Sequence, residues 1–92
     1  MAGPRYIADP QALARNVALD GLTAIFHAPS GLTHLLAPPA PQILAALAGR
    51  PGSAEEVLAR IAESFELEAA NPADAIAARL AELEAVGLVA KT

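Results

Sequence analysis

The chain has 92 residues, of which 54% are hydrophobic, carries a formal charge of −4 and contains no cysteine. This length fits one domain, and the absence of cysteine excludes disulfides and thiolate chemistry. The six basic residues are scattered, and no apolar run approaches the roughly 20 residues that span a bilayer. We therefore expect a cytoplasmic protein that binds neither nucleic acid nor membrane.

The first residues, 1–11, contain Pro4 and Pro10 and show no hydrophobic period. We predict a flexible N-terminal segment here, which Tyr6 or Ile7 could pin, and one domain over residues 12–92. Twenty-four residues are alanine, which contributes little side-chain area. Leucine, isoleucine, valine and phenylalanine must therefore carry the core.

Residues 13–36 predict a three-stranded antiparallel meander. Asp20-Gly21 separates two apolar runs and suits a hairpin turn in which both residues take positive φ. Ser30-Gly31 is a weaker turn signal, and centring a turn there pairs Phe26 with Leu35 and His27 with His34. Alternation along the strands then gives a core face and a second, mixed face: Leu13, Val17, Leu19, Leu22, Phe26 and Leu35 on the first; Asn16, Thr23, Ile25, His27, His34 and Leu36 on the second.

The remainder of the chain predicts three helices. The proline-rich stretch 37–41 stops the sheet and leads into a short helix over about 39–48, which Gly49 ends. Ser53 and Glu56 form a capping box for a second helix that runs to about residue 65. Asn71-Pro72 starts a third helix, whose apolar stripe is Ile76, Leu80, Leu83 and Val86. The expected fold class is α+β.

Catalytic chemistry finds little support in the sequence. The predicted register makes His27 and His34 cross-strand neighbours, but zinc sites in proteins use three or four ligands. The serines at 30 and 53 are explained as a turn and a helix cap, and no glycine-rich phosphate loop is present. We expect no enzyme activity, no metal and no cofactor.

The third strand, Leu32 to Leu36, is expected to be a free edge of the meander. It carries no residue with a fixed charge that would discourage pairing with another chain. An extended peptide could add to it as a further strand. Alternatively the N-terminal segment or a second copy of the chain covers it, and exchange of strands about the 37–41 hinge would give a homodimer.

Three stretches resemble a known family: LDGL at the first turn, PSGLTHLLAPPAPQILAAL from the last strand into the first helix, and LAELEAVGLV near the end. Over residues 12–90 the chain resembles the PqqD-like peptide chaperones, the recognition elements for ribosomally made, modified precursor peptides (RiPPs). The SG-x-THLL stretch is most similar to the branch of the HPr-rel-A system, found beside HPr-kinase-related proteins.

This resemblance implies a winged-helix-like, non-catalytic protein that binds the leader of a precursor peptide and presents it to a modifying enzyme, for which an HPr-kinase-related protein is the candidate. It implies a leader site between the third strand and the third helix. The strand would supply backbone pairing, with Leu35 toward the core and His34 and Leu36 on the other face. The helix would supply a wall and, at the rim, an arginine for an acidic peptide residue. The implied residues are Thr33, His34, Leu35, Leu36, Ile76, Arg79, Leu80 and Leu83.

Two alternatives remain at this stage. One is a winged-helix regulatory or nucleic-acid-binding module, against which the acidic balance argues. The other is a structural dimerisation unit.

Overall fold

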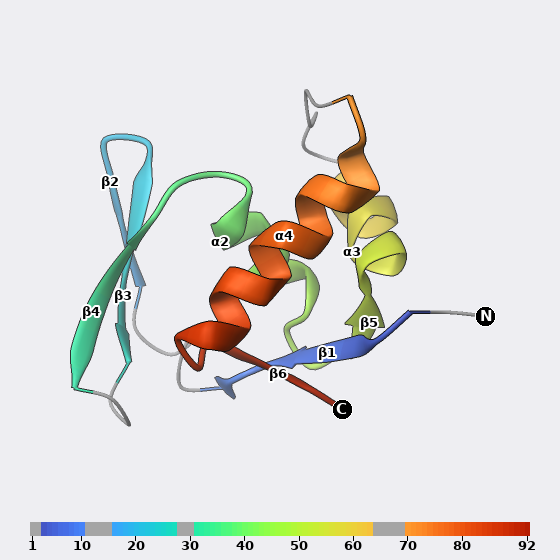
Figure 1. Ribbon diagram of the computed structural model, residues 1–92. Helices are drawn as coiled ribbons and strands as arrows, with labels where there is room; N and C mark the ends of the chain where they lie inside the picture. The colour runs from blue at the N-terminus through green and yellow to red at the C-terminus, as the bar shows by residue number, and fades with distance from the viewer. Residues whose placement is uncertain (1–2, 11–15, 28–30, 64–69) are drawn as a thin grey trace.

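The computed structural model describes residues 3–10, 16–27, 31–63 and 70–92, and Figure 1 shows their arrangement. These residues form an α+β fold with two three-stranded antiparallel sheets, in the strand orders β5-β1-β6 and β2-β3-β4, together with three helices. The predicted fold class and the meander followed by three helices are confirmed. The second sheet was not predicted.

The meander consists of β2 (Asn16–Leu19), β3 (Leu22–His27) and β4 (Leu32–Leu36). Asp20 and Gly21 have φ values of 45° and 83°, so the first turn is the one predicted. The second predicted register is wrong, because Phe26 pairs with Thr33 rather than with Leu35. His27 pairs with Leu32, so four residues lie between these two positions instead of the two of a tight turn.

The register also separates the two histidines. His34 lies opposite Ile25, and His27 lies opposite Leu32, so the predicted cross-strand histidine pair does not exist. The shift amounts to two residues, and a shift of two leaves every side chain on its predicted face.

The predicted core face of the meander is nevertheless wrong. Val17 and Leu35 on that face are 59% and 64% exposed, whereas Ile25 on the opposite face is only 3% exposed. Leu36, also on the Ile25 face, packs against the core. The helices cover the face of the meander that has fewer apolar residues. Counting the apolar residues on each face therefore predicts the wrong face to be buried. Leu13 lies outside the described residues.

The second sheet is built from three distant segments: β1 (Arg5–Ala8), β5 (Gly52–Ser53) and β6 (Val89–Lys91). β1 is its central strand and pairs with both neighbours. Tyr6 and Ala8 are 7% and 4% exposed. The predicted flexible N-terminal segment is therefore corrected over Arg5–Ala8, which is a paired strand with one side buried; residues 1–2 and 11 lie outside the described residues.

The helices are α2 (Ala40–Ala46), α3 (Ala54–Ile61) and α4 (Pro72–Ala85). The capping box of α3 is confirmed: the Glu56 N–H donates to Ser53 Oγ at 3.2 Å, and the Ser53 N–H donates to Glu56 Oε1 at 2.9 Å. α3 ends at Ile61, earlier than predicted, and Phe65 lies outside the described residues. Asn71 is at the N-cap position of α4, but its side chain makes no capping hydrogen bond within the described residues.

The C-terminal end of α4 brings the chain back to the second sheet. Gly87 has a φ of 83°, a conformation that glycine adopts at little cost after a helix. The Leu88 N–H donates to the Leu83 carbonyl at 2.9 Å, and the Asp9 N–H donates to the Leu88 carbonyl at 2.9 Å. This places Leu88 in the core, where it is fully buried.

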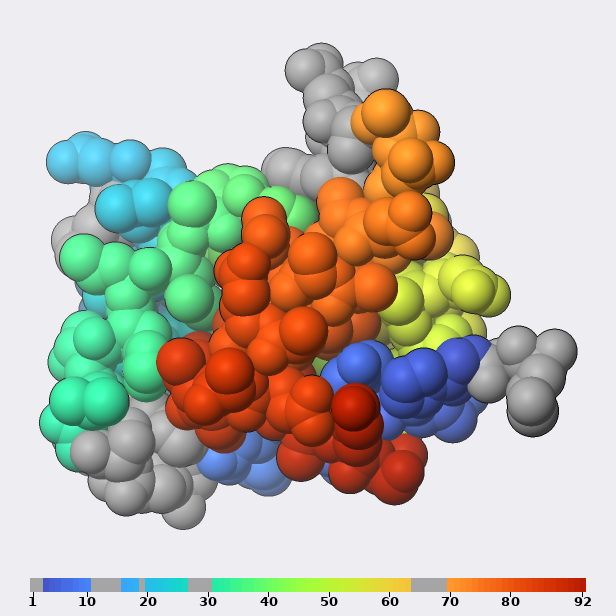
Figure 2. Space-filling view, in the orientation of Figure 1, coloured from blue at the N-terminus to red at the C-terminus, as the bar shows by residue number. Residues whose placement is uncertain are grey.

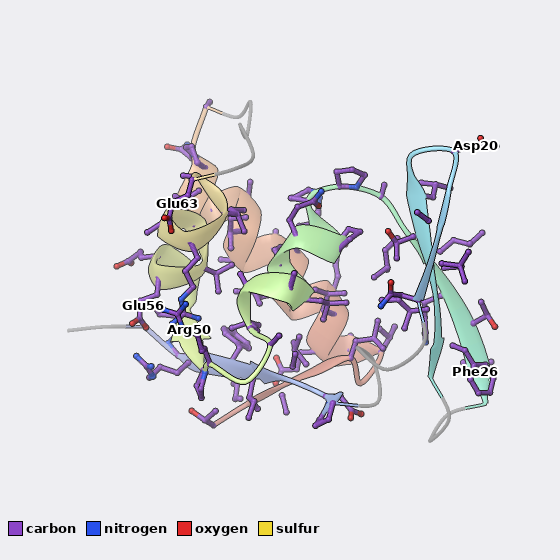
Figure 3. All side chains as sticks on the ribbon, turned by 180° about the vertical axis from the view of Figure 1, so that it is seen from behind. Asp20, Phe26, Arg50, Glu56 and Glu63 are labelled. Atoms are coloured by element: carbon purple, nitrogen blue, oxygen red, sulfur yellow. The ribbon has the colours of Figure 1, made fainter. Side chains whose placement is uncertain are left out.

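Arg60 ties α3 to the segment that connects it with α2. Its guanidinium donates to the carbonyls of Ala46, Arg50 and Pro51 at 2.9–3.0 Å. On the neighbouring surface, Arg5 of β1 donates to Glu56 at 2.6 Å, and Figure 3 shows Glu56 and Arg50 on this side of the molecule. Polar contacts thus fasten the second sheet to α3.

The core lies between the helices and the second sheet, with the meander at one side (Figure 1). The α4 stripe is confirmed for Ile76, Leu80 and Leu83, whereas Val86 is 45% exposed. The buried hydrophobic residues of the described chain are Tyr6, Ala8, Ile25, Ala40, Ile43, Leu44, Leu47, Val57, Ile61, Ile76, Leu80, Leu83, Leu88 and Val89.

Candidate functional site

A groove of about 510 Å³ lies between β4 and the C-terminal half of α4. Figure 2 shows the two segments beside each other on the surface. A volume of this size is in the range of ligand sites in proteins. β4, the start of α2 and one side of α4 line it, through Thr33, His34, Leu35, Leu36, Ala37, Pro38, Ala40, Arg79, Glu82, Leu83 and Val86.

Most of the residues that the resemblance implied come together in this groove. Thr33, His34, Leu35, Leu36, Arg79 and Leu83 all line it. Ile76 and Leu80 do not, because both are fully buried in the core. They hold α4 in place behind the groove wall.

β4 presents an open backbone edge. Its sheet has the order β2-β3-β4, and no described strand pairs with the other side of β4. The two-residue turn between β2 and β3 makes Leu19 and Leu22 a hydrogen-bonded pair, so the backbone groups of Leu22 point toward β2. Because backbone groups along β3 alternate between its two neighbours, the N–H and C=O groups of Thr33 and Leu35 point away from β3. These groups are positioned to pair with an added strand.

The side chains of β4 point opposite to the prediction. Leu35, expected in the core, is 64% exposed, while His34 and Leu36 are half-buried and face the helices. The cause is the inverted burial of the meander described above. Leu35 therefore contributes its backbone and the outer rim to the groove, and Leu36 contributes to its floor.

The charged rim of the groove is an ion pair. Arg79 donates to Glu82 Oε2 at 2.5 Å, one turn along α4, and the two side chains are 41% and 64% exposed. An exposed pair of this kind contributes little, because water screens it and both side chains lose freedom. A ligand carboxylate can therefore compete for Arg79. Its Nε is buried and has no hydrogen-bond partner within the described residues, which leaves one donor unsatisfied beside the groove.

Sequence reasoning missed several lining residues. Val86 was assigned to the core stripe, but it borders the groove, as does Glu82. Ala37 and Pro38 were interpreted only as the end of the sheet. Glu82 could have been predicted from the sequence, because it stands three residues after Arg79 on the same helix face, where it can form an ion pair with it. The others depend on how β4 and the chain that leads into α2 lie beside α4.

A second cavity, of about 420 Å³, lies between α2 and α3. Arg50 and Arg60 border it, but the Arg60 guanidinium is already bonded to three carbonyls. Across the described residues, no three His, Cys, Asp or Glu side chains gather as metal ligands.

In comparisons with known proteins, no family model, no curated protein and no solved structure matches the chain. Among the described helices, none is long and apolar enough to cross a bilayer.

Proposed function

We propose that this chain is a non-catalytic peptide chaperone of the PqqD-like kind, acting in the cytoplasm. It binds the leader of a ribosomally made precursor peptide as an extended segment and presents it to a modifying enzyme, for which an HPr-kinase-related protein is the candidate. The observation that carries the proposal is the open backbone edge of β4 beside a groove whose opposite wall is α4.

The edge and the groove supply complementary parts of peptide recognition. The backbone groups of Thr33 and Leu35 offer hydrogen bonds that are independent of the peptide sequence. Every second peptide side chain then faces the groove, where Leu36, Leu83 and Val86 provide apolar contacts. Arg79 provides a cation for an acidic peptide residue once Glu82 is displaced.

The nucleic-acid alternative receives no support from α4. Arg79 is its only basic residue and is bonded to Glu82, and the helix also carries Asp74 and Glu84. A recognition helix needs cations that reach phosphates.

The first experiment removes one of the two backbone donors of β4 that point away from β3. Leu35→Pro deletes an N–H on the open side of an edge strand, where proline is tolerated. Ala18→Pro is the matched control, because the same alternation directs the Ala18 N–H to the open side of β2, the opposite edge. Peptides selected from a random library on the unmodified protein are titrated calorimetrically. We expect Leu35→Pro to abolish binding and Ala18→Pro to preserve it.

The second experiment reverses the rim charge. Arg79→Glu should weaken acidic peptides by about tenfold or more through electrostatics, whereas Arg50→Glu, the same charge change at the second cavity, should not. Amide shifts complete the test. Shifts confined to Ala54–Ile61, with Thr33–Leu36 and Ile76–Leu83 unmoved, would show that the peptide site lies elsewhere.

A further inference from the structure

The outer surface of the meander is an exposed apolar face. We define the outer apolar face by Val17, Leu22, Ala24, Phe26 and Leu35, and we propose that it pairs with the same face of a second copy of this chain. This inference is independent of the proposed function. It concerns the face of the sheet, not the edge of β4.

The residues of this face are contiguous. The register places Val17, Ala24 and Leu35 in one row across the three strands. Leu22 and Phe26 stand two residues to either side of Ala24 along β3. Val17 and Leu35 are 59% and 64% exposed, and Leu22 and Phe26 are both 37% exposed. Figure 3 shows Phe26 on the meander, at the opposite side of the molecule from Arg50 and Glu56.

The charge distribution favours a second copy. Within the described strands of the meander no Asp, Glu, Lys or Arg occurs, and Asp20 lies at the tip of the first hairpin (Figure 3). The chain as a whole has a charge of −4, which would oppose association through most of its surface. On this face two copies approach without like charges opposite each other.

The area also fits a homodimer. The exposed parts of these side chains amount to about 400 Å² per chain, or about 800 Å² for two copies, which is below the standard interface size and fits a weak, reversible interface. A two-fold axis brings identical patches together and closes the assembly at two chains. Sheets packed face to face lie about 10 Å apart, a spacing that Leu and Phe side chains fill. The open edge of β4 stays free in such a dimer.

The test is sedimentation velocity from the micromolar to the millimolar range, where an interface of this size dissociates. Phe26→Lys is compared with Ile7→Lys, which adds the same charge at a strand residue of the other sheet with 39% exposure. Lysine lowers the net negative charge, so greater repulsion between chains cannot explain a loss of dimer. We expect Phe26→Lys to weaken dimerisation about tenfold or more, because the charge becomes buried. Ile7→Lys should leave it unchanged.

Val17→Lys repeats the test at a side chain that is 59% exposed, where folding should tolerate the change.

One introduced cysteine per chain gives a second readout, because the chain has no cysteine of its own. A short bismaleimide crosslinker should join two Ala24→Cys chains, because a spacing of about 10 Å between the sheets is too long for a direct disulfide, and it should not join Ala18→Cys chains, whose cysteine lies on the opposite face of the sheet. A chain that stays monomeric at all concentrations overturns the proposal. A dimer that persists in both Phe26→Lys and Val17→Lys also overturns it. The latter result would indicate pairing through the β4 edge.

Discussion

The meander β2-β3-β4 and the sheet β5-β1-β6 meet the helices in different ways. In the meander, Ile25 is the one described side chain that is less than 9% exposed, and several larger apolar side chains face outward. In the second sheet, Tyr6, Ala8 and Val89 are all buried, and Arg5 and Ser53 bond to α3. The second sheet is part of the core, whereas the meander mainly supplies surfaces: an open edge beside a groove and an apolar face.

This difference suggests a division of labour within a small fold. Stability comes from the helices and a sheet whose strands are far apart in sequence. The meander can then expose a strand edge without endangering the core, because few buried contacts depend on it. The following predictions test that separation, from the largest expected effect to the smallest.

The two aromatic strand residues should differ most. Tyr6→Ala empties a site that is 7% exposed in the central strand of the second sheet, and we expect a loss of about 3–5 kcal/mol in the free energy of unfolding. Phe26→Ala, at 37% exposure on the meander, should cost about 1–2 kcal/mol. Urea unfolding measures both. Equal losses would contradict the division between the sheets.

Gly52 tests how tightly β5 is fastened. A Cβ at this position would lie 2.9 Å from Arg60 Nη1, and the guanidinium cannot retreat without losing bonds to carbonyls. We expect Gly52→Ala to lower the free energy of unfolding by about 1–2 kcal/mol. Gly3→Ala is the control, since no atom of the described residues lies within 4 Å of a Cβ added there. In an Arg60→Ala background the Gly52→Ala effect should largely disappear; if it persists, the clash is not its cause.

The two helix caps should also be unequal. Ser53 accepts a hydrogen bond from the Glu56 N–H, so Ser53→Ala should cost about 1 kcal/mol of unfolding free energy. Asn71 makes no such bond within the described residues, and Asn71→Ala should change the unfolding free energy by less than about 0.5 kcal/mol. Thermal unfolding of the two variants gives the comparison. A larger effect at Asn71 would mean that α4, not α3, depends on its cap.

The smallest expected effect is a pH dependence at the junction of β5 and α3. The Ser53 backbone N–H, with the Arg5 and Arg60 guanidiniums nearby, lowers the pKa of Glu56 against an opposing desolvation. A lowered carboxyl pKa stabilises the fold above the unfolded value of about 4.3, and the contribution is lost as the pH falls through the folded value. Between about pH 6 and pH 3, Glu56→Gln should therefore lose less stability than the unmodified chain. Glu55→Gln, at an exposed neighbour, should behave like the unmodified chain.

Much of the local structure followed from short sequence patterns. The Asp20-Gly21 turn, the Ser53 capping box, the start of α4 at Pro72 and the buried stripe of Ile76, Leu80 and Leu83 each depend on residues within a few positions of one another. Backbone sterics and helical periodicity act over that range, so the sequence alone determined them.

The tertiary structure decided the rest. β1 pairs with strands more than 40 residues away, so no local pattern marks it. The buried face of the meander depends on where α2 and α4 pack, and burial by the helices outweighs the larger number of apolar residues on the other face. The groove exists only because β4 and the chain that leads into α2 lie beside α4. These features arise from contacts between segments that are distant in sequence. The free energy of those contacts depends on the whole core, so no single stretch of sequence predicts them.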